Sequence, residues 1–191
     1  MKIFGAIGLN GSGKDEVVKY LQQGYNVPLI SVGHIVREIA REQGLPINRD
    51  NLHRISRERI DEFGKEYFMN LVVAKIGQNG WRNAGITGIR TPEDIRYLKE
   101  QYNSDFILFH VFVRSVRLRY ERTHKRAKAR DPKTYDAFLE QDREEERMFH
   151  IDEASSMADY SLNNSGSLES LHKQIDEIIE TENFELEKGK N

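Results

Sequence analysis

The chain has 191 residues, of which 38% are hydrophobic and 31% charged, and its formal net charge is -2 at neutral pH. This composition is typical of a globular protein and gives no overall attraction to nucleic acid or to a membrane surface. Cysteine is absent, which excludes disulfides, thiolate catalysis and cysteine-based metal sites. No run approaches the roughly 18 apolar residues of a spanning helix, and residues 3–9 are too short for a signal peptide. We therefore expect a cytoplasmic protein.

The N-terminal segment alternates between strand and helix patterns. Residues 3–9 form an apolar run bounded by glycines, which is typical of a central strand buried on both faces of a parallel sheet. Val17, Val18 and Leu21 then recur at helical spacing, and Gly24 indicates the end of that helix. Residues 27–32 predict a second strand.

The middle of the chain continues the alternation. Apolar spacing predicts three helices, two strands follow, and Thr91 with Pro92 indicates a capped helix start between those strands. The expected helices cover residues 35–40, 52–63 and 67–76, and the expected strands cover residues 84–89 and 106–113. His110 lies in the second of these strands and is expected to pack in the core.

The C-terminal part is more polar. We expect a long helical region over residues 115–156, a short strand at 160–162 and a final helix over 168–179, followed by a frayed polar tail at 182–191. Alternating strands and helices predict an α/β fold, a three-layer parallel sheet of about five strands with helices on both faces. We expect one domain over residues 1–181.

Residues 8–15 read Gly-Leu-Asn-Gly-Ser-Gly-Lys-Asp and match G-x-x-x-x-G-K-[ST] at every defined place except the last. Glycines in such a loop let backbone N–H groups approach phosphate oxygens, and the lysine adds a mobile cation. The following helix adds the positive end of its dipole. The pattern predicts that a nucleoside triphosphate, taken as ATP with GTP left open, is bound by Gly8, Asn10, Gly11, Ser12, Gly13, Lys14 and Asp15.

Asp15 departs from this pattern, because a serine or threonine hydroxyl normally binds Mg²⁺ at that place. A carboxylate is also a hard oxygen ligand, so Asp15 is our candidate metal ligand. Without metal it would repel the phosphates. We therefore expect nucleotide binding to depend strongly on Mg²⁺.

Residues 30–37 read Ile-Ser-Val-Gly-His-Ile-Val-Arg and resemble the I-S-T-G-D-x-x-R segment of adenylate kinases and related nucleoside monophosphate kinases. The resemblance implies that Gly33 and Arg37 contact the phosphoryl acceptor, with His34 in place of the usual aspartate. At the end of the third strand, Gly88 and Arg90 match the D-G-x-R of relatives and imply further acceptor contacts, whereas Thr87 replaces the acid.

Residues 122–179 instead resemble dephospho-CoA kinases. The R-x-x-x-R pattern is present at Arg122 and Arg126, and residues 158–166 resemble the A-D-x-x-I-x-N-x-G strand and loop. This resemblance implies a lid over about residues 122–135 and a contact to the donor base near Asn164 and Gly166. The helical acceptor region would cover about residues 34–80. As a whole the chain resembles a largely archaeal group of adenylate-kinase-like proteins.

We expect a kinase that moves the γ-phosphate of ATP to a nucleotide-type small molecule. Lys14, Arg122 and Arg126 would stabilise the transferring charge. A phosphate acceptor needs no base, which favours a nucleoside or deoxynucleoside monophosphate over dephospho-CoA. A nucleotide-dependent regulatory module without an acceptor stays open as the alternative. The basic run at residues 114–130 could also bind nucleic acid, but it lacks interleaved aromatic residues, and we rank that reading last.

Overall fold

The computed structural model describes residues 1–126 and 131–189, apart from the side chain of Arg49. Residues 127–130, which belong to the expected lid, and residues 190–191 of the expected tail lie outside the described residues. In the described part, no helix combines enough length and apolar character to cross a membrane.

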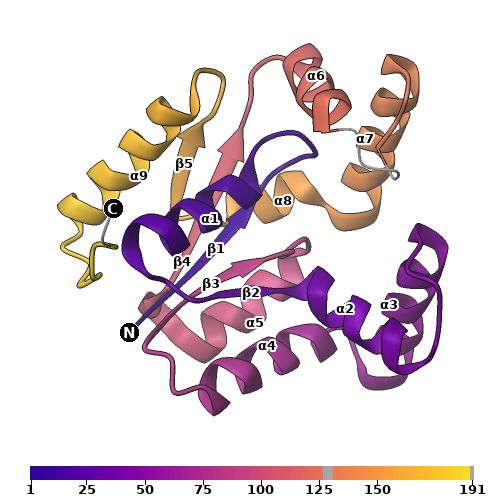
Figure 1. Cartoon of the computed structure of the whole chain (residues 1–191), viewed down its shortest axis with the longest axis horizontal. Helices are drawn as coiled ribbons and strands as arrows, with labels where there is room; N and C mark the ends of the chain where they lie inside the picture. Colours follow the sequence, from indigo (N-terminus) through magenta and orange to yellow (C-terminus); the bar gives the residue numbers. More distant parts are fainter. Residues whose placement is uncertain (127–130, 190–191) are drawn as a thin grey trace.

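The core of the molecule is a parallel sheet of five strands in the order β2-β3-β1-β4-β5. This confirms the expected fold class. The strands are β1 (Lys2–Ile7), β2 (Leu29–Ser31), β3 (Asn83–Thr87), β4 (Phe106–Phe112) and β5 (Tyr160–Asn163). Figure 1 shows β1 at the centre, where five of its six residues are buried, as expected for a strand covered on both faces.

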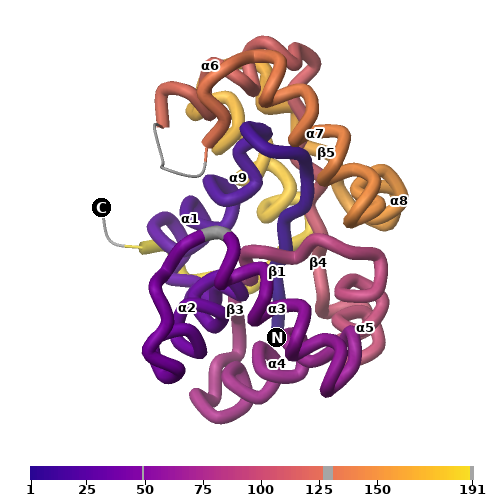
Figure 2. The backbone as a smooth tube through the Cα atoms, turned by 90° about the vertical axis from the view of Figure 1, so that its right-hand side faces the viewer, coloured from indigo at the N-terminus to yellow at the C-terminus, as the bar shows by residue number. Residues whose placement is uncertain are grey.

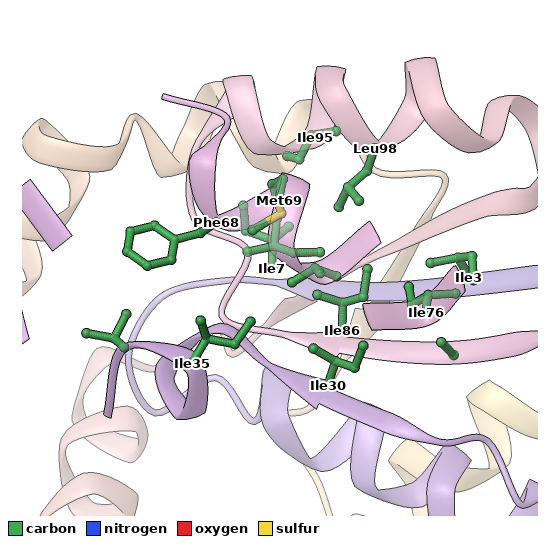
Figure 3. Packing of buried hydrophobic residues seen from close by; sticks show 14 of the residues in the cluster. Ile3, Ile7, Ile30, Ile35, Phe68, Met69, Ile76, Ile86, Ile95 and Leu98 are labelled. Carbon is green, nitrogen blue, oxygen red and sulfur yellow. The ribbon is translucent and has the colours of Figure 1, made fainter. Parts of the chain in front are cut away.

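Alternate side chains of β1 enter two different hydrophobic clusters, one on each face of the sheet. Phe4 and Ala6 pack with α1 (Lys14–Tyr25) and α9 (Leu168–Thr181). Ile3 and Ile7 enter the other cluster, part of which is drawn in Figure 3. That cluster is covered by α2 (Val32–Glu42), α3 (Arg49–Phe63), α4 (Tyr67–Gln78), α5 (Pro92–Tyr102) and α8 (Ile151–Ser156).

Several element boundaries differ from the expectation. Helix α1 continues through Gly24 and ends at Tyr25, and the C-cap residue Asn26 takes the left-handed conformation at φ 52°. Val32 begins α2 instead of ending a strand, because the Ser31 hydroxyl accepts a hydrogen bond from the His34 N–H and caps the helix. The predicted start of α5 is confirmed, with Thr91 in a capping box and Pro92 in the first turn.

The expected long helical region at 115–156 is divided into separate helices. They are α6 (Val116–Arg126), α7 (Tyr135–Phe149) and α8. The break between α7 and α8 falls at His150, which has a φ of 49°. A left-handed residue cannot continue an α-helix, so the chain turns sharply there.

The described part of the tail is docked on the molecule at some residues while most of it is exposed, so it is less frayed than expected. The ring of Phe184 lies edge-on to Phe4, with centroids 5.8 Å apart. The Gly189 N–H donates to the Gly24 carbonyl at 2.8 Å. The aromatic residue in the polar tail therefore extends the cluster beneath α1.

The carboxyl ends of the strands share one edge of the sheet, where ligands bind in folds of this type. Residues 8–13 leave β1 at this edge. Figure 1 shows α2 and α3 on one side of this loop and α6 and α7 on the other, and Figure 2 shows the two groups at opposite ends of the molecule. The candidate site is therefore bounded by two helical segments.

Candidate phosphate-binding site

Residues 8–13 connect β1 to α1 as a tight loop. The Ser12 N–H donates to the Leu9 carbonyl at 3.1 Å, and Gly11 and Gly13 have φ values of 78° and 94°. Residues with a side chain rarely adopt such angles. Gly13 is also the N-cap of α1 and has no side-chain cap, which leaves N–H groups of the first turn available to an anion.

The opposite end of the chain supports this loop. The Asn164 side chain is 2% exposed and donates from Nδ2 to the Ser12 carbonyl at 2.7 Å. A Cβ on Gly13 would lie 2.1 Å from the same Nδ2 atom. The side chain expected to contact the donor base thus holds the loop in this conformation, and the exposed Gly166 lies two residues further along.

Helix α6 forms a second support. A Cβ on Gly11 would lie 2.4 Å from the Arg119 carbonyl oxygen, so the loop rests directly on the α6 backbone. The Arg119 guanidinium is buried, donates from Nη1 to the Asn10 carbonyl at 3.0 Å and forms a bidentate pair with Asp142 at 2.7 and 2.6 Å. The sequence did not single out Arg119 for this role, since it lies in the basic run at residues 114–130, where no local signal distinguishes one arginine from the next.

Lys14 lies at the first position of α1 and is half-buried. Desolvation lowers the pKa of its ammonium group, Asp15 and Glu145 oppose this shift, and Arg90 and Arg126 reinforce it. The four charged groups must therefore lie close enough to Lys14 to act on it electrostatically. Arg90, beyond the end of β3, and Arg126, at the end of α6, thus act electrostatically on the lysine of the phosphate loop.

The two arginines expected in the lid are both held by the protein. Arg122 donates from Nη1 to the Asn164 carbonyl at 2.7 Å and from Nη2 to the Gly166 carbonyl at 3.1 Å. Arg126 forms two hydrogen bonds with Asp131, and this pairing raises the pKa of Arg126. Arg122 therefore shapes the loop after β5, while Arg126 lies nearer the lysine.

The expected acceptor residues come from two neighbouring segments. A Cβ on Gly88 would lie 3.1 Å from Val32 Cβ and 3.7 Å from the Gly33 nitrogen, so the ends of β3 and β2 meet here. A Cβ on Gly33 would lie 3.3 Å from Arg37 Nη1. His34 is exposed, and its Nε2 lies 3.1 Å from Glu38 Oε1.

Arg90 belongs to the same edge. Its guanidinium lies over the Phe149 ring at 5.0 Å from the centroid, which links the end of β3 to the last turn of α7. The backbone N–H of Arg90 donates to Asp94 Oδ2 at 3.0 Å. Gly33, Arg37 and Gly88 are therefore neighbours at the ends of β2 and β3, and their contact with an acceptor, like that of Arg90, stays a prediction.

Asp15 is exposed in the first turn of α1. No group of three or more histidine or acidic side chains in residues 1–126 and 131–189 could hold a metal ion by itself. Mg²⁺ is commonly held by one or two carboxylates together with substrate phosphates and water. An exposed hard oxygen ligand beside the phosphate loop fits that kind of site.

A cavity of ≈ 100 Å³ lies beside the loop, between the end of β4 and α8. His110 lines it and is half-buried, so it is not the packed core residue that we expected. Burial lowers the pKa of His110, and Asp152 on the opposite wall opposes the shift. Ser12 also lines the cavity, and its buried hydroxyl has no hydrogen-bond partner within the described part of the chain.

Several solved structures with the same architecture are kinases. Shikimate kinase from Aquifex aeolicus aligns with a TM-score of 0.55 at 20% identity, over 96% of this chain and 99% of that one. A gluconokinase from Sinorhizobium meliloti aligns with a TM-score of 0.53 at 15% identity, over 96% of each chain. At these identities the likeness establishes the fold, and the protein has a P-loop kinase-like fold of the nucleotide-binding type.

Sequence relatives give the narrower assignment. Residues 7–138 match the family model described as an AAA domain. A UPF0200 protein of Thermococcus kodakarensis is 32% identical over 178 residues, which cover 90% of this chain and 95% of the relative. One of Methanococcus maripaludis is 32% identical over 171 residues, covering 87% and 90%. The chain belongs to the UPF0200 family, and its residues 7–138 belong to the family described as an AAA domain. The expected likeness to an archaeal group is thus confirmed, whereas the finer likeness to adenylate and dephospho-CoA kinases stays a prediction.

Proposed function

We propose that this protein is a kinase that transfers the γ-phosphate of ATP to a nucleotide-type small molecule. The observation that carries this proposal is the convergence of cations on Lys14. Arg90, from the acceptor side, and Arg126, from the lid side, both lower the pKa of that lysine. Phosphoryl transfer requires alignment and positive charge around the moving group and little covalent chemistry.

On the donor side, the loop residues Gly8, Asn10, Gly11, Ser12, Gly13 and Lys14 bind the phosphates. Asn164 and Gly166 lie in the segment that Arg122 anchors, which suits a contact to the donor base through the backbone of that segment. Lys14 and Arg126 stabilise the charge on the transferring group, and Arg122 holds the loop after β5 in place. Asp15 holds Mg²⁺, which would supply further charge neutralisation on the phosphate oxygens when bound.

On the acceptor side, Arg37 and Arg90 bind an acceptor phosphate, and Gly33, Gly88 and His34 border its nucleoside. The β3 end carries Thr87 where the D-G-x-R pattern has an acid, so no carboxylate at that position can remove a proton from a hydroxyl. A phosphate anion needs no such base. This argument favours a nucleoside or deoxynucleoside monophosphate.

The contact between His34 Nε2 and Glu38 Oε1 favours a second candidate, a hydroxyl acceptor. A neutral imidazole that donates from Nε2 to a carboxylate keeps Nδ1 free to accept a proton from a hydroxyl group. Dephospho-CoA is such an acceptor, and the structurally similar shikimate kinase and gluconokinase indicate two more compounds to test. We rank these compounds behind the monophosphates.

The test is ATP turnover with each acceptor class in turn, using the wild type and two lysine variants. Lys14→Ala should abolish turnover, whereas Lys19→Ala, an exposed lysine of the same helix that pairs with Glu16, should leave it unchanged. Turnover stimulated by one acceptor supports the kinase and identifies its substrate. Slow turnover that no acceptor accelerates would favour the regulatory NTPase, and full activity of Lys14→Ala would overturn both.

A further inference from the structure

Helix α7 contacts the phosphate loop through two acidic residues one turn apart. Asp142 acts through Arg119, whose Nη1 reaches the Asn10 carbonyl at 3.0 Å. Glu145 acts directly, because its Oε1 accepts a hydrogen bond from Asn10 Nδ2 at 2.7 Å. The same loop residue is therefore held by its backbone and by its side chain.

The two carboxylates differ in how their charge is balanced. Both oxygens of Asp142 are bound by Arg119, and its side chain is 13% exposed. Glu145 is half-buried and bonds a neutral amide, and it forms no ion pair with any cation in residues 1–126 or 131–189. Within the described residues, the carboxylate of Glu145 at the rim of the loop therefore has no salt-bridge partner of its own.

That charge acts on the cations expected to hold phosphate. Asp15 and Glu145 act to raise the pKa of Lys14, and both also act to raise the pKa of Arg126. Asp15 belongs to the loop motif and is our candidate metal ligand. Glu145 comes from 130 residues further along the chain and is placed there by the hydrogen bond to Asn10.

We propose that Glu145 makes this site select the magnesium complex of a nucleotide over the free nucleotide. The inference rests on the nucleotide-binding function proposed above. A free triphosphate carries more negative charge than its metal complex, so a fixed carboxylate beside the loop penalises the free form more. At the separations and effective dielectric typical of a protein surface, one such charge changes the affinity for a multiply charged ligand by roughly tenfold.

Glu145→Gln tests this directly, because glutamine keeps an oxygen that accepts from Asn10 and removes only the charge. The neighbouring Glu144→Gln is the matched control, since Glu144 is exposed on the same helix. Dissociation constants of ATP should be measured by calorimetry at constant ionic strength, with excess Mg²⁺ and with EDTA. Thermal melting of each variant checks that the fold is intact.

We expect Glu145→Gln to tighten the binding of metal-free ATP by roughly tenfold, to change the binding of MgATP far less, and so to reduce the preference for the complex. The Glu144→Gln protein should keep the wild-type preference. An unchanged preference in Glu145→Gln, or weaker binding of MgATP, as expected if Glu145 held the metal itself, would overturn the inference.

The same measurements separate this inference from the proposed function. Wild-type protein that binds neither form of ATP would contradict nucleotide binding itself. Wild-type protein that binds ATP but phosphorylates no acceptor would contradict the kinase while the preference for MgATP is still measured. The ratio of the dissociation constants of metal-free ATP and MgATP therefore decides the role of Glu145.

Discussion

Gly11 in the phosphate loop rests against the backbone carbonyl of Arg119 in α6, with 2.4 Å between that oxygen and the position of a Cβ. The loop is therefore supported by a helix more than 100 residues away in the sequence. The contact involves backbone on the α6 side, so no side-chain rotation can relieve an added methyl group. This makes the loop sensitive to the smallest possible substitution.

Gly11→Ala should therefore abolish measurable nucleotide binding and lower the free energy of unfolding by about 2–4 kcal/mol, from backbone strain and steric conflict together. Gly44→Ala is the control, because Gly44 also has a positive φ but nothing lies within 4 Å of its Cβ position. The free energy of unfolding of Gly44→Ala should fall by about 1 kcal/mol from strain alone. Urea unfolding and ATP titration measure both effects, and equal losses in the two proteins would contradict the contact.

Asp142→Ala should destabilise the protein by about 3–5 kcal/mol, because it leaves the buried Arg119 guanidinium without its counter-charge. Glu140→Ala removes the partner of Arg143 in an exposed pair on the same helix and should cost about 0–1 kcal/mol. Denaturant midpoints of the two variants provide the comparison. A mild effect of Asp142→Ala would mean that water reaches the Arg119 guanidinium.

Arg122→Lys should weaken ATP binding by roughly tenfold while leaving the fold intact, because lysine cannot reproduce the forked contact to the Asn164 and Gly166 carbonyls. Arg117→Lys, an exposed change on the same helix, should bind ATP as the wild type does. Calorimetric titration with MgATP distinguishes them. Unchanged affinity in Arg122→Lys would remove this arginine from the nucleotide site.

Stability should fall as the pH falls because of His110. Burial lowers the pKa of its imidazole in the folded protein, whereas the unfolded chain titrates near its ordinary pKa of 6.5. Below about pH 6.5 the unfolded state therefore binds more protons than the folded state. The free energy of unfolding that is present above this pH is consequently reduced as the pH falls through the lowered pKa of His110.

His110→Gln removes this titration. Urea unfolding between pH 8 and pH 5 should show a shallower decline for the variant than for the wild type, with the difference growing toward low pH. The comparison at pH 8, where the histidine is neutral in both states, isolates the packing effect of the substitution. Parallel declines in the two proteins would show that His110 does not couple folding to pH.

The strands and most helices could be predicted because their signals are local. An apolar run predicts β1, and the helical spacing of Val17, Val18 and Leu21 predicts α1. Boundaries were less well predicted where one residue decides a turn. Asn26 and His150 adopt left-handed backbone conformations, and the sequence around them does not predict these turns.

The site could be predicted in part. The position of Lys14 follows from the loop motif, and the grouping of Gly33 with Gly88 follows from the rule that parallel strands end at one edge. The distances that hold the loop in place could not be foreseen. Asn164 reaches Ser12, and Glu145 reaches Asn10, only after the whole sheet has formed.

By itself, the sequence determined a parallel α/β sheet and a phosphate loop with its lysine, because both are written in short-range patterns of apolar residues and glycine. Tertiary structure alone decided which charges support that loop. Arg117 and Arg119 stand two residues apart in one basic run, yet Arg117 is exposed and Arg119 is buried against Asp142. Burial depends on which neighbours the fold brings to each helix face, and no local pattern in this run distinguishes the two arginines.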